Sequence, residues 1–213
     1  MTEVIIALGA DNERVKEVFA ELFPSEDFFY SDTCVLPAAS AREGLLWGFW
    51  GDPLDRLEAS KNFLEREGLA LAKIIAVVDA VELERRGGHD EWFEALAHFS
   101  DTMLLLNSKQ VSPSWLSAWR KKLKDRPMQL FDWPEIARKN PEIARAEILY
   151  PEARRLSQYF EAGGPPPDLP LFEGEDDAAA EIAEGEDDDP YVSEKFFERD
   201  AAGRRRYRLS PPQ

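Results

Sequence analysis

Apolar runs along the chain predict the strands of a buried sheet. Three of them stand out: EVIIAL at 3–8, KIIAVVD at 73–79 and TMLLLN at 102–107. Each run is apolar at successive positions, as expected for a parallel strand that is covered on both faces. The run at 73–79 is the strongest and predicts a central strand. A shorter run at 128–131 predicts a last strand at the end of this series.

Between these runs, apolar residues recur with the spacing of helices. Val15, Val18, Phe19 and Leu22 fall at i, i+3, i+4 and i+7, which places them on one face of a helix that ends before Pro24. Similar spacing, together with start and stop residues, predicts further helices: one between Asp52-Pro53 and Gly68, one at 90–99, one starting at Ser112-Pro113, and one at 134–159 interrupted at Pro141 and Pro151.

The segment 25–51 has a less regular pattern. Residues 28–30 are compatible with a short strand, and GLLWGFWGDP at 44–53 is interpreted as a packed loop. Strands that alternate with helices at this spacing predict an α/β fold with right-handed crossovers. We therefore expect a domain at 1–160 with a mainly parallel sheet of four or five strands flanked by helices, similar to P-loop and Rossmann-like folds.

The composition changes after Phe160. Residues 161–189 contain AGGPPPDLP at 162–170 and continue into an acidic stretch, 173–189, in which 10 of 17 residues are acidic and none is basic. Such a segment buries too little apolar surface to offset its ordering entropy, so we expect a disordered linker. Residues 190–213 differ again, because they combine aromatic side chains with a basic cluster. This end predicts a short segment that docks, on the chain's own body or on another protein.

Charge and composition narrow the classes of function. The net charge is −16, which repels phosphate backbones, so we expect no nucleic-acid partner and a basic protein as the better match. Cys34 is the single cysteine, so an intramolecular disulfide and a four-cysteine zinc site are both excluded, and two histidines make a histidine-rich metal site a poor interpretation. No run approaches the length of a membrane span, which favours a cytoplasmic protein.

Candidate site residues follow from the strand pattern. Ligands of parallel sheets bind beyond the carboxyl ends of the strands. The polar and glycine residues expected there form one candidate pocket: Gly9, Ala10, Asp11, Asn12, Asp79, Asn107 and Lys109.

Four short motifs occur in the order found in the CobW-like group of P-loop GTPases, a metallochaperone family. They are LGADNER after the first strand, GDPLDRL at 51–57, IIAVVDA at 74–80 and FSDTMLLLNSKQVS at 99–112. These segments resemble that family's Walker A turn, its motif before a helix, its strand ending in valine-aspartate-alanine, and its guanine-reading NKxD. The resemblance implies a P-loop GTPase-like fold over residues 3 to 125.

The residues that would hold a nucleotide depart from the family's pattern. A phosphate loop needs a lysine and a hydroxyl, whereas this turn offers Asp11, Asn12 and Glu13, whose carboxylates repel a triphosphate. Asn107 matches NKxD, but Gln110 stands where the guanine-binding carboxylate should be. We therefore expect no GTP hydrolysis and no cofactor. Simpler roles are a helix cap for Asp79 and a turn residue for Asn107.

These observations favour a non-catalytic adaptor protein on a degenerate GTPase-like domain. Its expected protein-binding residues are those of the C-terminal end: Tyr191, Phe196, Phe197, Arg204, Arg205, Arg206 and Tyr207. Two alternatives remain open, namely a weak nucleotide binder and an enzyme for a small molecule that uses Asp11, Asp79 and Asn107. The sequence does not fix the oligomeric state.

Overall fold

The structure is a computed structural model that covers most of the region 3–160 and a short C-terminal segment. The residues it describes are 3–9, 12–22, 29–30, 45–49, 52–87, 91–149, 154–157, 159–160 and 195–209. The expected disordered linker at 161–189 lies outside the described residues, as does Tyr191.

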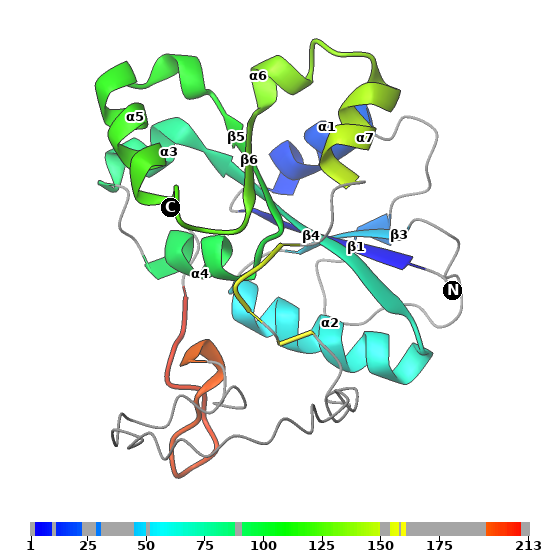
Figure 1. Cartoon of the computed structure of the whole chain (residues 1–213). Coiled ribbons are helices and arrows are strands. Elements are labelled where there is room, and N and C mark those ends of the chain that lie inside the picture. Colours follow the sequence, from blue (N-terminus) through cyan, green and yellow to red (C-terminus); the bar gives the residue numbers. More distant parts are fainter. Residues whose placement is uncertain are drawn as a thin grey trace, which may run out of the picture.

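A six-stranded parallel sheet forms the centre of the fold, with the order β2-β3-β1-β4-β5-β6 (Figure 1). Its strands are β1 (Glu3–Gly9), β2 (Phe29–Tyr30), β3 (Leu45–Phe49), β4 (Ala70–Asp79), β5 (Thr102–Leu106) and β6 (Gln129–Asp132). The predicted parallel α/β fold is confirmed. The strand predicted at 73–79 is central, because β4 pairs with β1 on one side and β5 on the other.

The sheet has six strands, whereas we expected four or five. The difference lies at β3, where the sequence interpretation of 44–53 as a packed loop was wrong. Residues 45–49 pair in parallel with β1, with Leu45 opposite Val4 and Phe49 opposite Leu8. Glycine weakens the local strand signal, whereas the backbone of a distant strand supplies the pairing.

Helices cover both faces of the sheet, and alternate strand residues point to each face (Figure 1). One face carries α1 (Asn12–Leu22), α6 (Trp133–Ile136) and α7 (Pro141–Leu149), which pack on Ile5, Ala7, Ile75 and Val77. The other face carries α2 (Pro53–Glu67), α3 (Ala80–Arg85), α4 (Glu91–Phe99) and α5 (Pro113–Lys122), which pack on Ile6, Leu8, Ile74 and Ala76. Two short 3-10 turns are η1 (Ser108–Gln110) and η2 (Lys195–Phe197).

Helix α2 begins and ends where its cap residues predict. The Asp52 side chain accepts a hydrogen bond from the Leu54 amide at 2.9 Å, and Pro53 occupies the first turn. Gly68 ends the helix with a φ of 63°, a left-handed conformation that glycine adopts without steric cost. This segment therefore carries its boundaries in its own sequence.

Two helical regions differ from the prediction. The six-residue helix α3 follows β4 directly, and its short apolar pattern was missed. In the opposite direction, helix was predicted up to 159, whereas residues 154–157 are not helical. A contact with a residue far away in the sequence positions this segment, because Arg155 donates a hydrogen bond to the Asp101 carboxylate at 2.9 Å.

Candidate functional site

The first candidate site lies at the carboxyl ends of β1, β4 and β5. Gly9 ends β1 opposite Val77 of β4. A Cβ atom at Gly9 would come within 2.5 Å of the Val15 Cγ2 atom and 3.1 Å of the Val77 carbonyl oxygen. Glycine is therefore required here by the close packing of α1 on the strand. Ala10, Asp11 and the side chain of Asn12 lie outside the described residues.

Asp79 and Asn107 meet at this edge of the sheet, and their polar atoms bind each other. One Asp79 oxygen accepts the amides of Val81 at 2.8 Å and Glu82 at 3.4 Å, which caps α3. The other oxygen accepts the Asn107 side-chain amide at 2.6 Å. Asn107 itself has a φ of 52° and begins the turn η1. The predicted simple roles, a cap and a turn residue, are confirmed.

The lysines near this edge do not converge on it. Lys16, on α1, pairs with Glu13 at 2.6 Å one turn away, on the helix surface. Lys109 lies in η1 and is exposed. The structure therefore brings Asp79 and Asn107 together among the predicted pocket residues and leaves Lys109 at the surface.

A buried polar cluster lies at the opposite edge of the sheet. Asp101 precedes β5 and is buried, and its carboxylate accepts the Ile74 amide at 2.8 Å and the Arg155 guanidinium at 2.9 Å. Burial raises the pKa of Asp101, against the opposing effect of Arg155. Lys73, also buried, donates to the Ile148 carbonyl at 2.9 Å, and burial lowers its pKa. These contacts join α7 and residues 154–157 to the sheet, which is a structural role.

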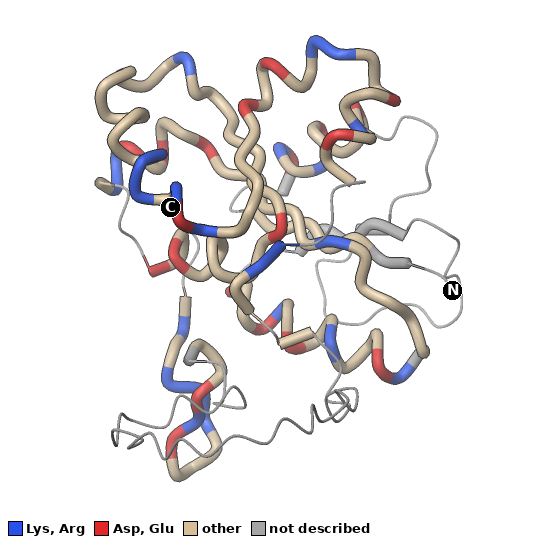
Figure 2. The backbone as a smooth tube through the Cα atoms, viewed as in Figure 1, with Lys and Arg blue, Asp and Glu red and all other residues tan. Residues whose placement is uncertain are grey.

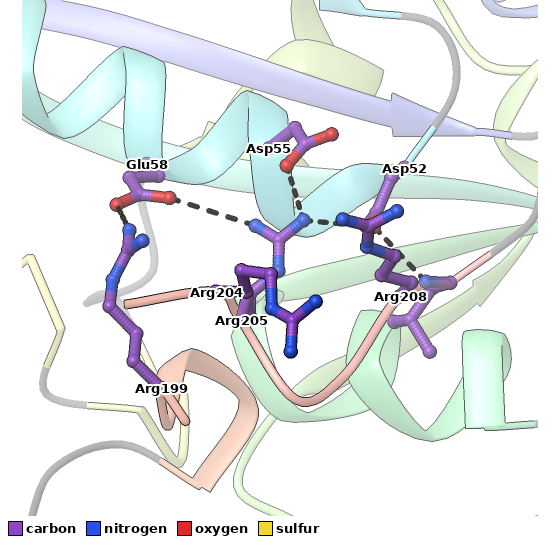
Figure 3. A pocket seen from close by; sticks show the side chains of 8 residues that line it. Asp52, Asp55, Glu58, Arg199, Arg204, Arg205 and Arg208 are labelled. Atoms are coloured by element: carbon purple, nitrogen blue, oxygen red, sulfur yellow. Dashed lines mark hydrogen bonds and ion pairs between the residues drawn. The ribbon is translucent and has the colours of Figure 1, made fainter. Parts of the chain in front are cut away.

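The second candidate site is where the C-terminal segment, residues 195–209, contacts the start of α2 (Figure 3). Arg205 forms ion pairs with Asp52 at 3.0 Å, with Asp55, and with Glu58 at 3.7 Å. The same Asp52 carboxylate accepts the backbone amide of Leu209 at 3.0 Å. The Arg205 side chain is only 8% exposed, so its charge is held between these carboxylates.

A tight turn shapes this segment before it reaches α2. Arg199 and Arg205 form an antiparallel bridge, and Asp200 accepts the Arg204 amide at 2.9 Å inside the turn. Gly203 has a φ of 76°, which the turn requires. Arg199 also pairs with Glu58 of α2. Figure 2 shows basic residues along the segment and acidic residues along the neighbouring start of α2.

Aromatic side chains complete the contact on the other side of the segment. Phe196 is buried, with its ring centre 5.3 Å from that of His98 and 5.5 Å from that of Phe99, both on α4. The Tyr207 ring also lies against Phe196, with ring centres 5.7 Å apart. The segment therefore contributes side chains to the core cluster on this face of the sheet.

Tyr159 forms a second aromatic contact with the segment. Its ring stacks on Phe197, with centres 4.0 Å apart and planes 13° apart. Lys61 of α2 lies over the Tyr159 ring at 4.4 Å and donates a hydrogen bond to its carbonyl at 2.5 Å. Burial raises the pKa of Tyr159 to about 12, with a further contribution from the Glu58 carboxylate.

Between the segment and α2 lies an open pocket of about 630 Å³ (Figure 3). It is lined by three carboxylates and four arginines together with Leu209: Asp52, Asp55, Glu58, Arg199, Arg204, Arg205 and Arg208. The Asp55 side chain remains 61% exposed although it pairs with Arg205. The segment thus covers the acidic start of α2 without filling the space beside it.

The residues expected to bind a protein partner have different positions in the structure. Phe196, Phe197, Arg205 and Tyr207 contact the body of the chain, while Arg204 and Arg206 are exposed and pair with Asp200 and Glu198 of their own segment. Sequence reasoning missed the residues that receive them. These are Asp52, Asp55 and Glu58 on α2 and His98 and Phe99 on α4. The i, i+3, i+6 spacing of the three carboxylates was the available signal, because it places them along one side of a helix.

No metal-binding group and no membrane-crossing helix is found in the described part of the chain. Among those residues, no cluster of three or more His, Cys, Asp or Glu side chains is arranged to hold an ion. The described helices are also too short or too polar to cross a membrane.

Comparisons with known proteins find likeness in backbone structure. No family model matches the chain, and no curated protein matches it. A solved structure with a similar backbone is the Zn(II)-bound YjiA GTPase from E. coli, with 10% sequence identity and a TM-score of 0.45. The match covers 61% of this chain and 57% of that one, so this chain spans a little over half of that GTPase.

Proposed function

We propose that the protein is a non-catalytic adaptor that binds another protein and is built on a degenerate GTPase-like domain. The proposed partner is a basic protein, because the chain has a net charge of −16. Its interaction surface is the second candidate site, where the C-terminal segment meets α2 and α4.

The observation that carries this proposal is the way Asp79 is used. One carboxylate oxygen is bound by the N-terminal amides of α3 and the other by Asn107. A carboxylate that assists a bound nucleotide must instead face the metal or water of its ligand. Asp79 is engaged within the protein, which supports a role for this edge in stabilising the fold.

The order of the four family-like motifs supports a GTPase-like origin for the domain. Each is near a carboxyl end of a strand: LGADNER begins with the last two residues of β1, Asp52 and Pro53 follow β3, Asp79 ends β4 and Asn107 follows β5. The lysine, hydroxyl and guanine-reading carboxylate of that family are missing from these positions. The proposed domain therefore keeps the GTPase-like scaffold and lacks the residues that bind and hydrolyse a nucleotide.

Calorimetry on the full chain tests the non-catalytic part of the proposal. GTP, GDP and ATP are titrated separately into the protein with excess Mg²⁺, after the circular dichroism spectrum and a cooperative melt have shown that it is folded. We expect no heat of binding with nucleotide up to about 1 mM, since two carboxylates stand where a lysine would neutralise the phosphates. Micromolar binding would contradict the proposal and favour a nucleotide-binding function.

A further inference from the structure

The start of α2 and the end of α4 together form a surface with two chemically different parts. Asp52, Asp55 and Glu58 make an anionic part, and His98 and Phe99 make an aromatic part. We call these five residues the α2–α4 surface. The C-terminal segment contacts both parts at once: Arg205 meets the anionic part (Figure 3), and Phe196, nine positions earlier in the sequence, meets the aromatic part.

The observed contacts define what this surface recognises. One guanidinium reaches three carboxylates at the start of α2 through a planar fork of five donors, a geometry that the compact lysine ammonium does not offer. Phe196 supplies an aromatic ring to His98 and Phe99. The surface therefore selects an arginine and an aromatic residue held at a fixed separation.

Two observations indicate that the C-terminal segment is a replaceable occupant. The pocket of about 630 Å³ beside Arg205 remains open, and the Asp55 side chain is 61% exposed, so the carboxylates are not fully covered. The segment is also joined to the body through the 34 residues 161–194. A tether of this kind gives an effective concentration on the order of millimolar, which a tighter-binding partner can overcome.

The charges of the tether and the segment indicate the class of partner. The tether at 161–194 has 13 acidic residues and no basic one, whereas 195–209 has 6 basic and 2 acidic residues. A basic protein is attracted to the tether and to the α2 carboxylates alike. The basic partner would displace the C-terminal segment, which is itself basic and binds the same carboxylates.

We propose that the α2–α4 surface is a docking site for a basic protein segment that carries an arginine and an aromatic residue, and that residues 195–209 are a tethered competitor that covers this site in the free chain. The inference rests on the proposed adaptor function and names its surface and its regulation. In the free chain the site is closed by Arg205 and Phe196, and partner binding releases the C-terminal segment.

The test measures binding of a fluorescent peptide to full-length proteins. The probe is a fluorescently labelled synthetic peptide with the sequence of residues 195–209. Its binding is measured by fluorescence anisotropy. The Arg205→Ala chain should bind it about tenfold more tightly than the wild type, because the internal competitor is weakened. Arg205→Lys provides a milder variant if alanine impairs folding. Arg206→Ala is the matched control and should behave as the wild type, since Arg206 pairs with Glu198 inside the segment and does not line the pocket.

Changes to the probe and to the surface distinguish recognition from simple charge attraction. A scrambled peptide of equal charge, and a peptide with alanine in place of the arginine corresponding to Arg205, should bind at least about tenfold more weakly. Adding Asp55→Ala to the Arg205→Ala chain should also weaken binding of the original peptide.

Three results would overturn the inference. They are equal affinity of the wild-type and Arg205→Ala chains, equal binding of the scrambled peptide, and a wild-type dimer that Arg205→Ala dissociates, which would place the segment on a second copy. Each of these outcomes is independent of nucleotide calorimetry. A failure of the docking inference can therefore be told apart from a failure of the non-catalytic proposal.

Discussion

Replacing Arg205 with alanine should destabilise the whole chain, although Arg205 lies near its C-terminus. The guanidinium is 8% exposed and pairs with Asp52, whose side chain is 13% exposed. Removing one partner of a fully buried ion pair costs about 3–5 kcal/mol. Here the loss should be smaller, because Asp52 keeps the amide of Leu54 and Asp55 stays hydrated.

We therefore expect Arg205→Ala to lower the free energy of unfolding by about 2 kcal/mol and Tm by roughly 5 °C. Differential scanning calorimetry of the full chain measures both quantities. Arg204→Ala is the matched control: its side chain is 71% exposed and pairs with Asp200 inside the segment, so its effect should stay within about 0.5 kcal/mol. Equal Tm values for the two variants would refute the assignment of Arg205 to α2.

Three further predictions concern Gly9, Asp79 and Tyr159. Gly9→Ala places a methyl group 2.5 Å from Val15, so urea denaturation should show a loss of about 1–3 kcal/mol, and adding Val15→Ala should recover part of it. A loss that Val15→Ala does not reduce would refute the packing explanation. Asp79→Ala should cost about 1 kcal/mol through loss of the α3 cap, whereas Asp79→Ser should retain most of the stability. Equal losses for alanine and serine would argue against a capping role. The Tyr159 pKa of about 12 means that the folded state keeps the phenol proton where the unfolded chain has lost it. Stability should therefore fall between about pH 10 and 12, and more in the wild type than in Tyr159→Phe. Ultraviolet titration that shows every tyrosine ionising near its ordinary pKa would contradict this.

The parts of the fold that could be predicted from sequence are those encoded locally. The continuous, β-branched apolar run at 73–79 predicts a central strand because parallel strands covered on both faces have this composition. The boundaries of α2 could be predicted from three residues with local roles. Asp52 caps the first turn with its side chain, Pro53 fits the first helical position, and Gly68 ends the helix in a left-handed conformation.

The parts that could not be predicted depend on residues far apart in the chain. Strand β3 takes its conformation from pairing with β1, which its short sequence, LLWGF, does not indicate. Arg155 and Asp101 are 54 positions apart, and Arg205 and Asp52 are 153 positions apart. A single sequence gives the charge of each side chain but not which opposite charge it meets. The aromatic and basic composition of 190–213 could therefore predict docking, but not its position on α2 and α4.

The central claim is that residues 195–209 are held on α2 and α4 in the free chain. Heteronuclear NMR relaxation on the full-length protein tests it most directly, because each amide reports its own motion. We expect {¹H}–¹⁵N NOE values for Phe196, Arg205 and Leu209 that equal those of β4, and values typical of a mobile chain for 173–189. In Arg205→Ala the values for 195–209 should fall toward those of the linker. Low values throughout 195–209 in the wild type would contradict the claim.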